Sequence, residues 1–172
     1  MFDIGDYVVF GTDGVCRVED VGALDMEGVS KDKLYYTLAP HGKSGNNRIF
    51  APVEGKRVVM RKVITPEEAQ KLISDITDIG RLEIRDEKKR EETYKHVLQG
   101  CDCREIVSLI KEIYFRRQER TAQGKKLPSV DERYFTMAEN SLYGELCLPL
   151  NIDKEDVRDY ICAVVGETQV GL

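Results

Sequence analysis

The sequence predicts an α+β protein in which a small antiparallel β-barrel precedes an all-α helical domain of about five helices. Three observations along the 172 residues lead to this prediction. Short runs of branched and aromatic residues, separated by loops rich in Gly, Ser and Asn, fill the chain up to residue 64. A helix start signal stands at Thr65. From there to the end, apolar residues recur at helical spacing.

The barrel is predicted from five short strands. Residues 7–10 and 15–21 form an opening hairpin around Asp13-Gly14, because Gly tolerates positive φ and Asp can hydrogen-bond to its own backbone. Three further runs complete the set, at residues 33–38, 48–51 and 57–63. Five strands in so short a length are typical of an SH3-like or Tudor-like barrel.

The helical domain begins with a capping box. Thr65 is a natural N-cap, Pro66 suits the first helical position, and Glu68 can reach back to the cap. Signals for the later helices follow in order: a helix over residues 85–98 closed by Gly100, a cap at Asp102, a stop at Gly124, a second capping box at Ser129 and Glu132 with an end at Pro149, and a start at Asp153. The predicted domains are therefore residues 1–64 and 65–172.

Composition narrows the function classes. The net charge is −5, and no run of about 20 apolar residues or secretory signal is visible, so we expect a cytoplasmic protein without a membrane partner. Five cysteines, none in a CxxC pair, favour reduced thiols over disulfides or a zinc site. No phosphate-binding, nucleophile-elbow or metalloprotease motif is present. We therefore expect no enzymatic activity, cofactor, metal or small-molecule substrate.

Basic residues gather at two places in the helical domain, and either could contact phosphate. They are Lys88, Lys89 and Arg90 in the second predicted helix, and Arg116, Arg117, Arg120, Lys125 and Lys126 in and after the third. The alternative is an ordinary solvated helix surface. Acidic neighbours favour this alternative for the first group, whereas both interpretations stay open for the second.

The fourth predicted strand is a candidate docking edge. It comprises Arg48, Ile49, Phe50, Ala51 and Pro52. An edge strand offers unpaired backbone groups to a partner strand. The alternative, which physical considerations alone favour, is an edge that Arg48 and Pro52 protect from pairing.

Short motifs in a fixed order resemble the CarD/CdnL family of bacterial transcription regulators. The motifs are Gly5-Asp6-x-Val8-Val9-Phe10-x-x-x-Gly14-Val15, Ile49-x-x-Pro52-Val53, Arg90-x-x-x-Tyr94-Lys95-x-x-Leu98, Ile110-Lys111-x-x-Tyr114-x-Arg116-Arg117 and Ala138-Glu139-x-x-Leu142-x-Gly144-Glu145-Leu146. They extend over about the first 165 residues, and a switch from strands to helices falls between the second and the third.

The resemblance implies a fold and a function. The barrel would be the Tudor-like RNA-polymerase-interacting domain, similar to that of the transcription-repair coupling factor. It would add its edge strand to the β subunit of RNA polymerase. The helical domain would lie against promoter DNA near the upstream edge of the bubble and stabilise the open complex.

Two departures from the family pattern modify this expectation. Family members use a tryptophan wedge in the minor groove, at a position that falls within residues 83–90, but this chain has no Trp. A DNA contact would therefore be weak and largely electrostatic. Phe50 stands near the position of a family arginine in the edge strand, which indicates a more apolar contact with polymerase. An adaptor that binds a partner through the barrel without touching DNA remains the alternative function.

Overall fold

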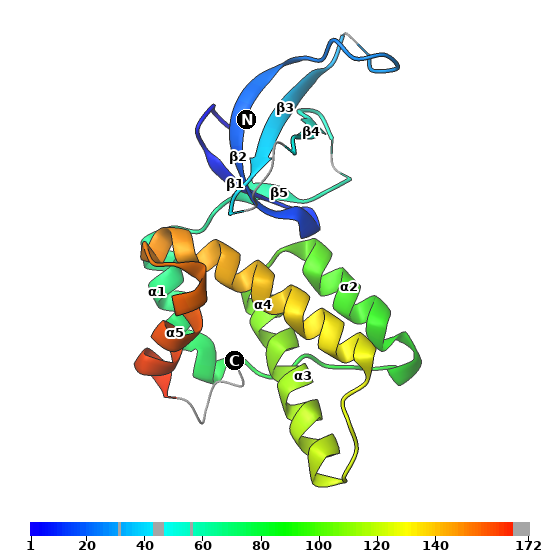
Figure 1. Cartoon of the computed structure of the whole chain (residues 1–172), viewed down its shortest axis with the longest axis vertical. Helices are drawn as coiled ribbons and strands as arrows, with labels where there is room; N and C mark the ends of the chain where they lie inside the picture. Colours follow the sequence, from blue (N-terminus) through cyan, green and yellow to red (C-terminus); the bar gives the residue numbers. More distant parts are fainter. Residues whose placement is uncertain (31, 43–46, 56, 167–172) are drawn as a thin grey trace. The chain divides into compact units, whose positions relative to one another are not determined.

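The computed structural model describes residues 1–30, 32–42, 47–55 and 57–166. The chain divides into two compact units, Met1–Val63 and Ile64–Leu172, which we call the sheet unit and the helical unit (Figure 1). Within the described residues the sheet unit holds five antiparallel strands and the helical unit holds five α-helices. The predicted α+β class, a small β module followed by a helical domain, is confirmed.

The sheet contains every strand that the sequence predicts. In chain order they are β1 (Tyr7–Phe10), β2 (Gly14–Ala23), β3 (Leu34–Pro40), β4 (Ile49–Pro52) and β5 (Met60–Lys62), and the order across the sheet is β4-β3-β2-β1-β5. The opening hairpin turns through a short 3-10 segment, Gly11–Asp13. Gly14 then takes a φ of +83°, the conformation for which glycine was predicted at this turn.

The sheet unit has its own small core. Alternate residues of the strands point to one face, where the buried members are Val8, Cys16, Val18, Tyr36, Leu38 and Ala51. Partly buried side chains, among them Phe2 and Met60, pack against this cluster. The period of two along each strand therefore separates an inner face from an outer face, and on the outer face Val9 and Val15 are also buried.

The helical unit confirms two of the predicted helix starts. Its helices are α1 (Pro66–Asp75), α2 (Arg90–Gly100), α3 (Cys103–Ala122), α4 (Ser129–Leu150) and α5 (Val157–Val165). Thr65 and Glu68 form the reciprocal capping box before α1. Asp102 accepts hydrogen bonds from the N–H groups of Arg104 and Glu105 and so caps α3.

The predicted second helix differs from the observed one at both ends. A 3-10 turn, η3 (Glu87–Lys89), precedes α2, so the regular helix begins at Arg90 rather than at residue 85. Gly100 is the last helical residue, and Cys101 closes the helix in the left-handed region, with a φ of +56°. The chain thus makes its turn one residue after the glycine.

The predicted ends of α4 lie within one residue of the observed ones, but the predicted capping box was wrong. Pro128 occupies the N-cap position, and no side chain caps this helix, so the expected box of Ser129 and Glu132 does not form. Pro149 lies inside the last turn, and the helix ends only where Asn151 takes a φ of +53°. A proline so close to the end interrupts the hydrogen-bond ladder without stopping the last turn.

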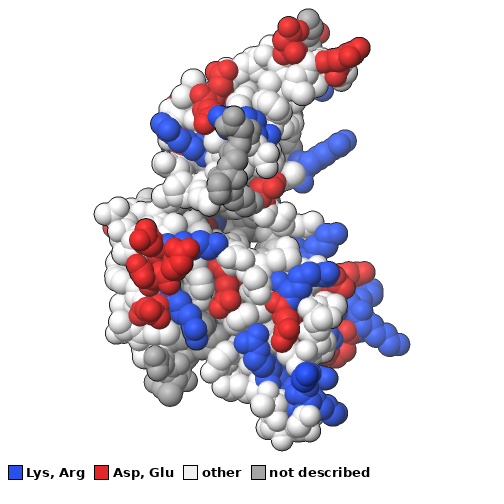
Figure 2. Space-filling model, viewed as in Figure 1, with Lys and Arg blue, Asp and Glu red and all other residues white. Residues whose placement is uncertain are grey.

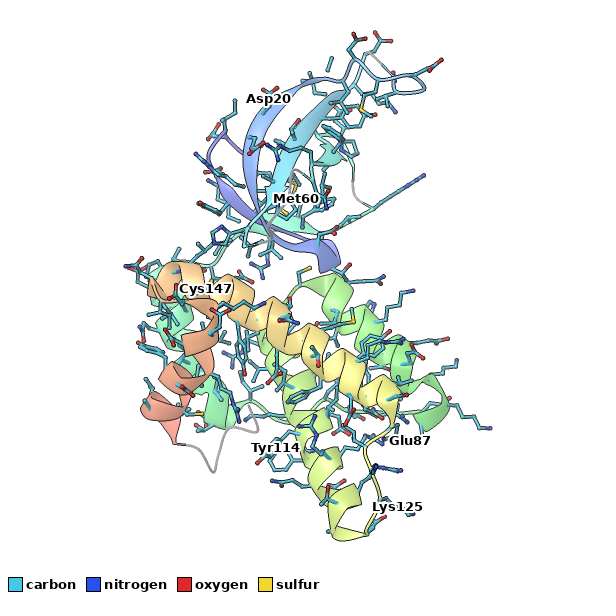
Figure 3. All side chains as sticks on the ribbon, viewed as in Figure 1. Asp20, Met60, Glu87, Tyr114, Lys125 and Cys147 are labelled. Atoms are coloured by element: carbon cyan, nitrogen blue, oxygen red, sulfur yellow. The ribbon has the colours of Figure 1, made fainter. Side chains whose placement is uncertain are left out.

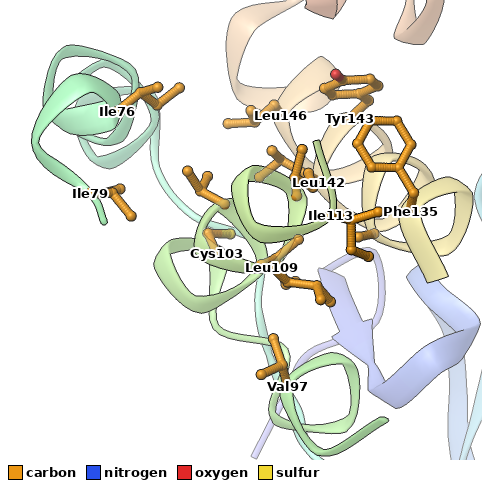
Figure 4. Close-up of a cluster of buried hydrophobic side chains, with 14 of the residues drawn as sticks. Ile76, Ile79, Val97, Cys103, Leu109, Ile113, Phe135, Leu142, Tyr143 and Leu146 are labelled. Carbon is orange, nitrogen blue, oxygen red and sulfur yellow. The ribbon is translucent and has the colours of Figure 1, made fainter. Parts of the chain in front are cut away.

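The core of the helical unit lies between α1, α2, α3 and α4, and α5 adds Val157 and Ile161 (Figure 4). Among the labelled residues, Leu109 and Ile113 of α3 lie near Leu142 of α4. None of the five cysteines, which all lie in the described residues, forms a disulfide, and three of them are buried. None of the helices in the described part of the chain has the length and apolar character needed to cross a membrane.

Candidate functional site

Strand β4 forms one edge of the sheet. It pairs with β3 on one side, and no described strand pairs with its other side. Ala51 is buried and Ile49 is half-buried on the inner face, whereas Phe50 and Pro52 are exposed. The sequence therefore placed this edge correctly, and the alternation along β4 directs Phe50 outward.

The hydrogen-bond pattern shows which backbone groups of β4 are free to pair. The Val53 N–H donates to the Leu34 carbonyl at 2.9 Å, and the register pairs Tyr36 with Ala51. In an antiparallel pair, the residues that exchange hydrogen bonds alternate with residues whose backbone groups point outward. Phe50 and Pro52 are the outward residues of β4. Phe50 thus offers an N–H and a C=O, and Pro52 offers only a C=O.

Apolar side chains accompany the free edge on the outer face. Phe50 lies directly opposite Thr37, and Pro52 lies opposite Tyr35. Both are non-hydrogen-bonded pairs, in which side chains approach most closely. Phe50 is 41% exposed although it is a large apolar residue. The outer face next to the edge therefore presents a short apolar strip that consists of Tyr35, Phe50 and Pro52. The sequence alone did not show that Tyr35 belongs to this strip.

Arg48 precedes the edge and is already paired. Its Nε lies 2.5 Å from Oε2 of Glu19, and both side chains are about one-third exposed (37% and 35%). Such a pair is screened by solvent and contributes little to stability. Its effect is to balance the charge next to Phe50, so that the apolar strip is the distinguishing feature of this edge.

The opposite edge of the sheet is β5, which pairs with β1 alone among the described strands. Val59, just before it, is 40% exposed. Lys62 of β5 forms an ion pair with Asp6 at 3.0 Å. Phe50 in β4 and Val59 beside β5 are thus similarly exposed apolar side chains, and Val59 provides an internal control for a docking experiment on β4.

In the helical unit, two of the predicted phosphate-contacting arginines are engaged in ion pairs. Arg90 forms two parallel hydrogen bonds with Asp131, of 2.9 and 3.0 Å, and a third with Glu87. Arg116 forms two with Glu87, of 3.1 and 2.9 Å, and one with Glu112. Their side chains are only 20% and 18% exposed. Both charges are neutralised within the protein.

These ion pairs have clear electrostatic consequences. Asp131 is fully buried and also accepts a hydrogen bond of 2.9 Å from the Tyr94 hydroxyl. Burial, together with that bond, raises the pKa of Tyr94 above its ordinary value. Glu87 raises the pKa of Arg116, and Arg116 in turn lowers the pKa of Glu87. One signal of this network is visible in the sequence, because Asp131 occupies a position on the apolar stripe of α4.

The network continues through Glu112, a buried carboxylate of α3. Its other oxygen accepts a hydrogen bond of 2.9 Å from Arg81, which also binds Glu119 at 2.6 Å. The chain between α1 and α2 is thereby attached to α3. Glu87 and Arg90, at the start of the second helical segment, thus hold structural ion pairs.

A further buried cation lies on α3. Lys111, only 4% exposed, donates to the carbonyl of Ile76 and, at 2.6 Å, to the carbonyl of Ile79. It thus adds a donor to two carbonyls just after α1, of which the Ile76 carbonyl also accepts the Ile79 N–H. Burial lowers the pKa of its ammonium group.

Arg117 and Arg120 are half-buried and make other contacts. The Arg117 guanidinium lies 4.5 Å from the centre of the Phe135 ring, a cation–π geometry. The Arg120 Nε donates to the Lys126 carbonyl at 2.7 Å and so holds the connection between α3 and α4. These two charges help to shape the end of α3 and keep part of their surface in solvent.

The four lysines of the predicted basic groups are the exposed members. Lys88 and Lys89 lie in η3, and Lys125 and Lys126 lie in the connection from α3 to α4. Figure 3 labels Lys125 in that connection and Glu87 in η3. In Figure 2, basic side chains gather over the α2 side and the far end of α3, while acidic ones gather over α5. The exposed positive charge is therefore smaller than the sequence indicated, and on the α2 side it is interspersed with acidic side chains.

One comparison with known proteins supplies the identity of the sheet unit. Residues 2–64 match the family model of the CarD-like/TRCF RID domain. The sheet unit is a CarD-like/TRCF RID domain. This RID domain indicates interaction with RNA polymerase in transcription, as the sequence resemblance implied. No curated protein matches the chain.

Proposed function

We propose that this chain is a non-enzymatic transcription regulator whose RID domain docks on the β subunit of RNA polymerase through β4. The observation that carries the proposal is the unpaired outer side of β4, where Phe50 combines free backbone groups with an exposed ring. Addition of a partner strand would pair those backbone groups, and burial of the ring would add apolar contact. The partner strand should therefore carry an apolar side chain next to Phe50.

The helical unit, in this proposal, contacts promoter DNA weakly and stabilises the open complex. The exposed lysines Lys88, Lys89, Lys125 and Lys126 are the candidate phosphate contacts. Arg90 and Arg116 are left out, because they hold carboxylates inside the unit. A protein that binds the open promoter better than the closed one shifts the population towards opening by that difference in affinity.

A polymerase-binding experiment with variants of the two sheet edges tests the docking proposal. Phe50→Asp places a charge in the contact, and we expect affinity for core polymerase to fall by roughly tenfold or more. Val59→Asp makes the same change at the β5 edge and should bind as the wild type does. Equal binding of Phe50→Asp and wild type would assign docking to another surface.

An adaptor that docks on polymerase without touching DNA is the second candidate function. The internal ion pairs of Arg90 and Arg116 favour it, because they remove two charges from the predicted DNA face. Footprinting of a promoter–polymerase complex with and without the protein separates the two functions. Extra protection of DNA supports the regulator with a DNA contact, whereas an unchanged footprint supports the adaptor.

A further inference from the structure

The peptide bond between Val63 and Ile64 joins the chain of the sheet unit to that of the helical unit. The Val63 N–H donates to the Tyr7 carbonyl at 3.2 Å, which continues the pairing of β5 with β1. The Ile64 N–H donates to Oε1 of Glu145 at 3.1 Å. The Thr65 N–H donates to the capping-box glutamate at 2.8 Å. Three successive amides are bonded, the first within the sheet unit and the next two within the helical unit.

Glu145 is an unusual residue for its position. Its side chain lies in α4 and the residue is only 2% exposed. Burial of a carboxylate is costly unless hydrogen-bond donors surround it. Glu145 receives the Ile64 N–H on one oxygen and the Cys103 thiol, at 3.2 Å, on the other. It thereby joins the first residue of the helical unit to α4 and α3, and the Ile64 side chain packs against the same core.

We propose that Glu145 is a latch that fixes the Ile64 amide to the helical unit and confines the hinge between the units to the backbone torsions of Val63. Linkers between domains usually contain several exposed residues without fixed partners. Here the rotatable torsions between the last sheet contact, at the Val63 N–H, and the first helical-unit contact, at the Ile64 N–H, are φ and ψ of Val63, since the peptide bond itself is planar. Loss of the Glu145 contact would lengthen the hinge by releasing Ile64. This inference does not rest on the proposed function.

Hydrogen exchange of the full chain tests the latch directly. In the wild type, the Ile64 amide should exchange as slowly as buried amides of α4, and exchange at the rate of an exposed amide would refute the proposal. Glu145→Leu removes both acceptor oxygens, so Ile64 protection should fall roughly tenfold to a hundredfold. Glu145→Gln keeps one acceptor oxygen and should retain most of the protection. Glu132→Gln, an exposed carboxylate on the same helix, is the matched control.

Distance distributions between the two units test the hinge. Spin labels on non-cysteine residues introduced at Asp20 and Lys125, both exposed, leave the native thiols intact. A short Gly-Ser insertion between Val63 and Ile64 provides the reference for a long hinge. We expect a broader distribution for the insertion than for the wild type, and Glu145→Leu should shift towards it. Equal widths for wild type and insertion would overturn the proposal, and this comparison holds even if Glu145→Leu does not fold.

Discussion

The β4 edge and the arginine-rich surface of the helical unit were both predicted as binding sites, and they differ in what remains available. At the edge, the outward backbone groups of Phe50 are left unpaired by the described strands. On the helical surface, Arg90 and Arg116 are less than one-quarter exposed and hold three carboxylates. A strand edge is free because of topology, whereas a cationic side chain can be neutralised by residues far away in the chain.

Replacement of Asp131 gives the largest expected effect on this comparison. Asp131→Ala leaves Arg90 and the Tyr94 hydroxyl without their buried acceptor, so the free energy of unfolding should fall by roughly 3 kcal/mol. The loss should stay at the lower end of the usual range, because Arg90 keeps Glu87. Chemical denaturation followed by circular dichroism measures it. Lys71→Ala, at an exposed ion pair, should stay close to wild type. An unchanged stability of Asp131→Ala would return Arg90 to the candidate DNA face.

Lys111 extends the comparison to a cation that no ligand could reach. Lys111→Met keeps the length of the side chain but removes the ammonium donor from the carbonyls of Ile76 and Ile79, of which the Ile76 carbonyl keeps the Ile79 N–H. The expected loss is about 1–3 kcal/mol in the free energy of unfolding. Polymerase affinity should not change, because the sheet unit is intact. A variant as stable as wild type would show that water replaces the ammonium group at this helix end.

The exposed lysines test whether the charges that remain on the helical surface bind DNA. Lys125→Ala with Lys126→Ala should leave folding unchanged and weaken binding to promoter DNA in the polymerase complex. If both contact phosphates, the slope of log affinity against log salt should decrease by roughly 1 to 2. Lys33→Ala, an exposed lysine of the sheet unit, is the control. An unchanged slope would favour the adaptor function.

Glu139 gives the smallest expected effect and a dependence on pH. Burial raises the pKa of this half-buried carboxyl. The protonated form is therefore favoured in the folded protein, and stability is lost as pH rises from the ordinary value through the raised pKa. Glu139→Gln should increase the free energy of unfolding by less than ~1 kcal/mol at neutral pH, since solvent screens the charge. Near pH ~4 the difference should disappear. A gain that does not depend on pH would point to packing instead.

The sequence predicted an element correctly where its signal depends only on neighbouring residues. Thr65, Pro66 and Glu68 specify a helix start by themselves, and the structure has it. The box at Ser129 failed because Pro128 takes the cap position. The predicted start of β5 at residue 57 was too early, because the strand begins at Met60, whereas the Val63 N–H still continues its pairing with β1. Such errors arise where neighbouring residues or tertiary contacts compete with a local preference.

The candidate sites were predictable to different degrees for the same reason. Alternation and Pro52 indicated an edge strand, and the sheet order confirms it. The partners of Arg116 could not be predicted, because Glu87 lies 29 residues away along the chain. Glu145 was visible only as part of a resemblance motif. Its contact with Ile64 spans 81 residues, and no local pattern encodes it.

Pro52 limits the number of hydrogen-bond donors that β4 offers to a partner strand. Within β4, which the structure describes completely, Phe50 supplies the single outward N–H, because Pro52 has none. A visiting strand therefore meets one donor and two acceptors. That is enough to orient a partner whose side chains also fit. It offers little to a second copy of the same protein, so the margin that serves recognition is poorly suited to seed an aggregate.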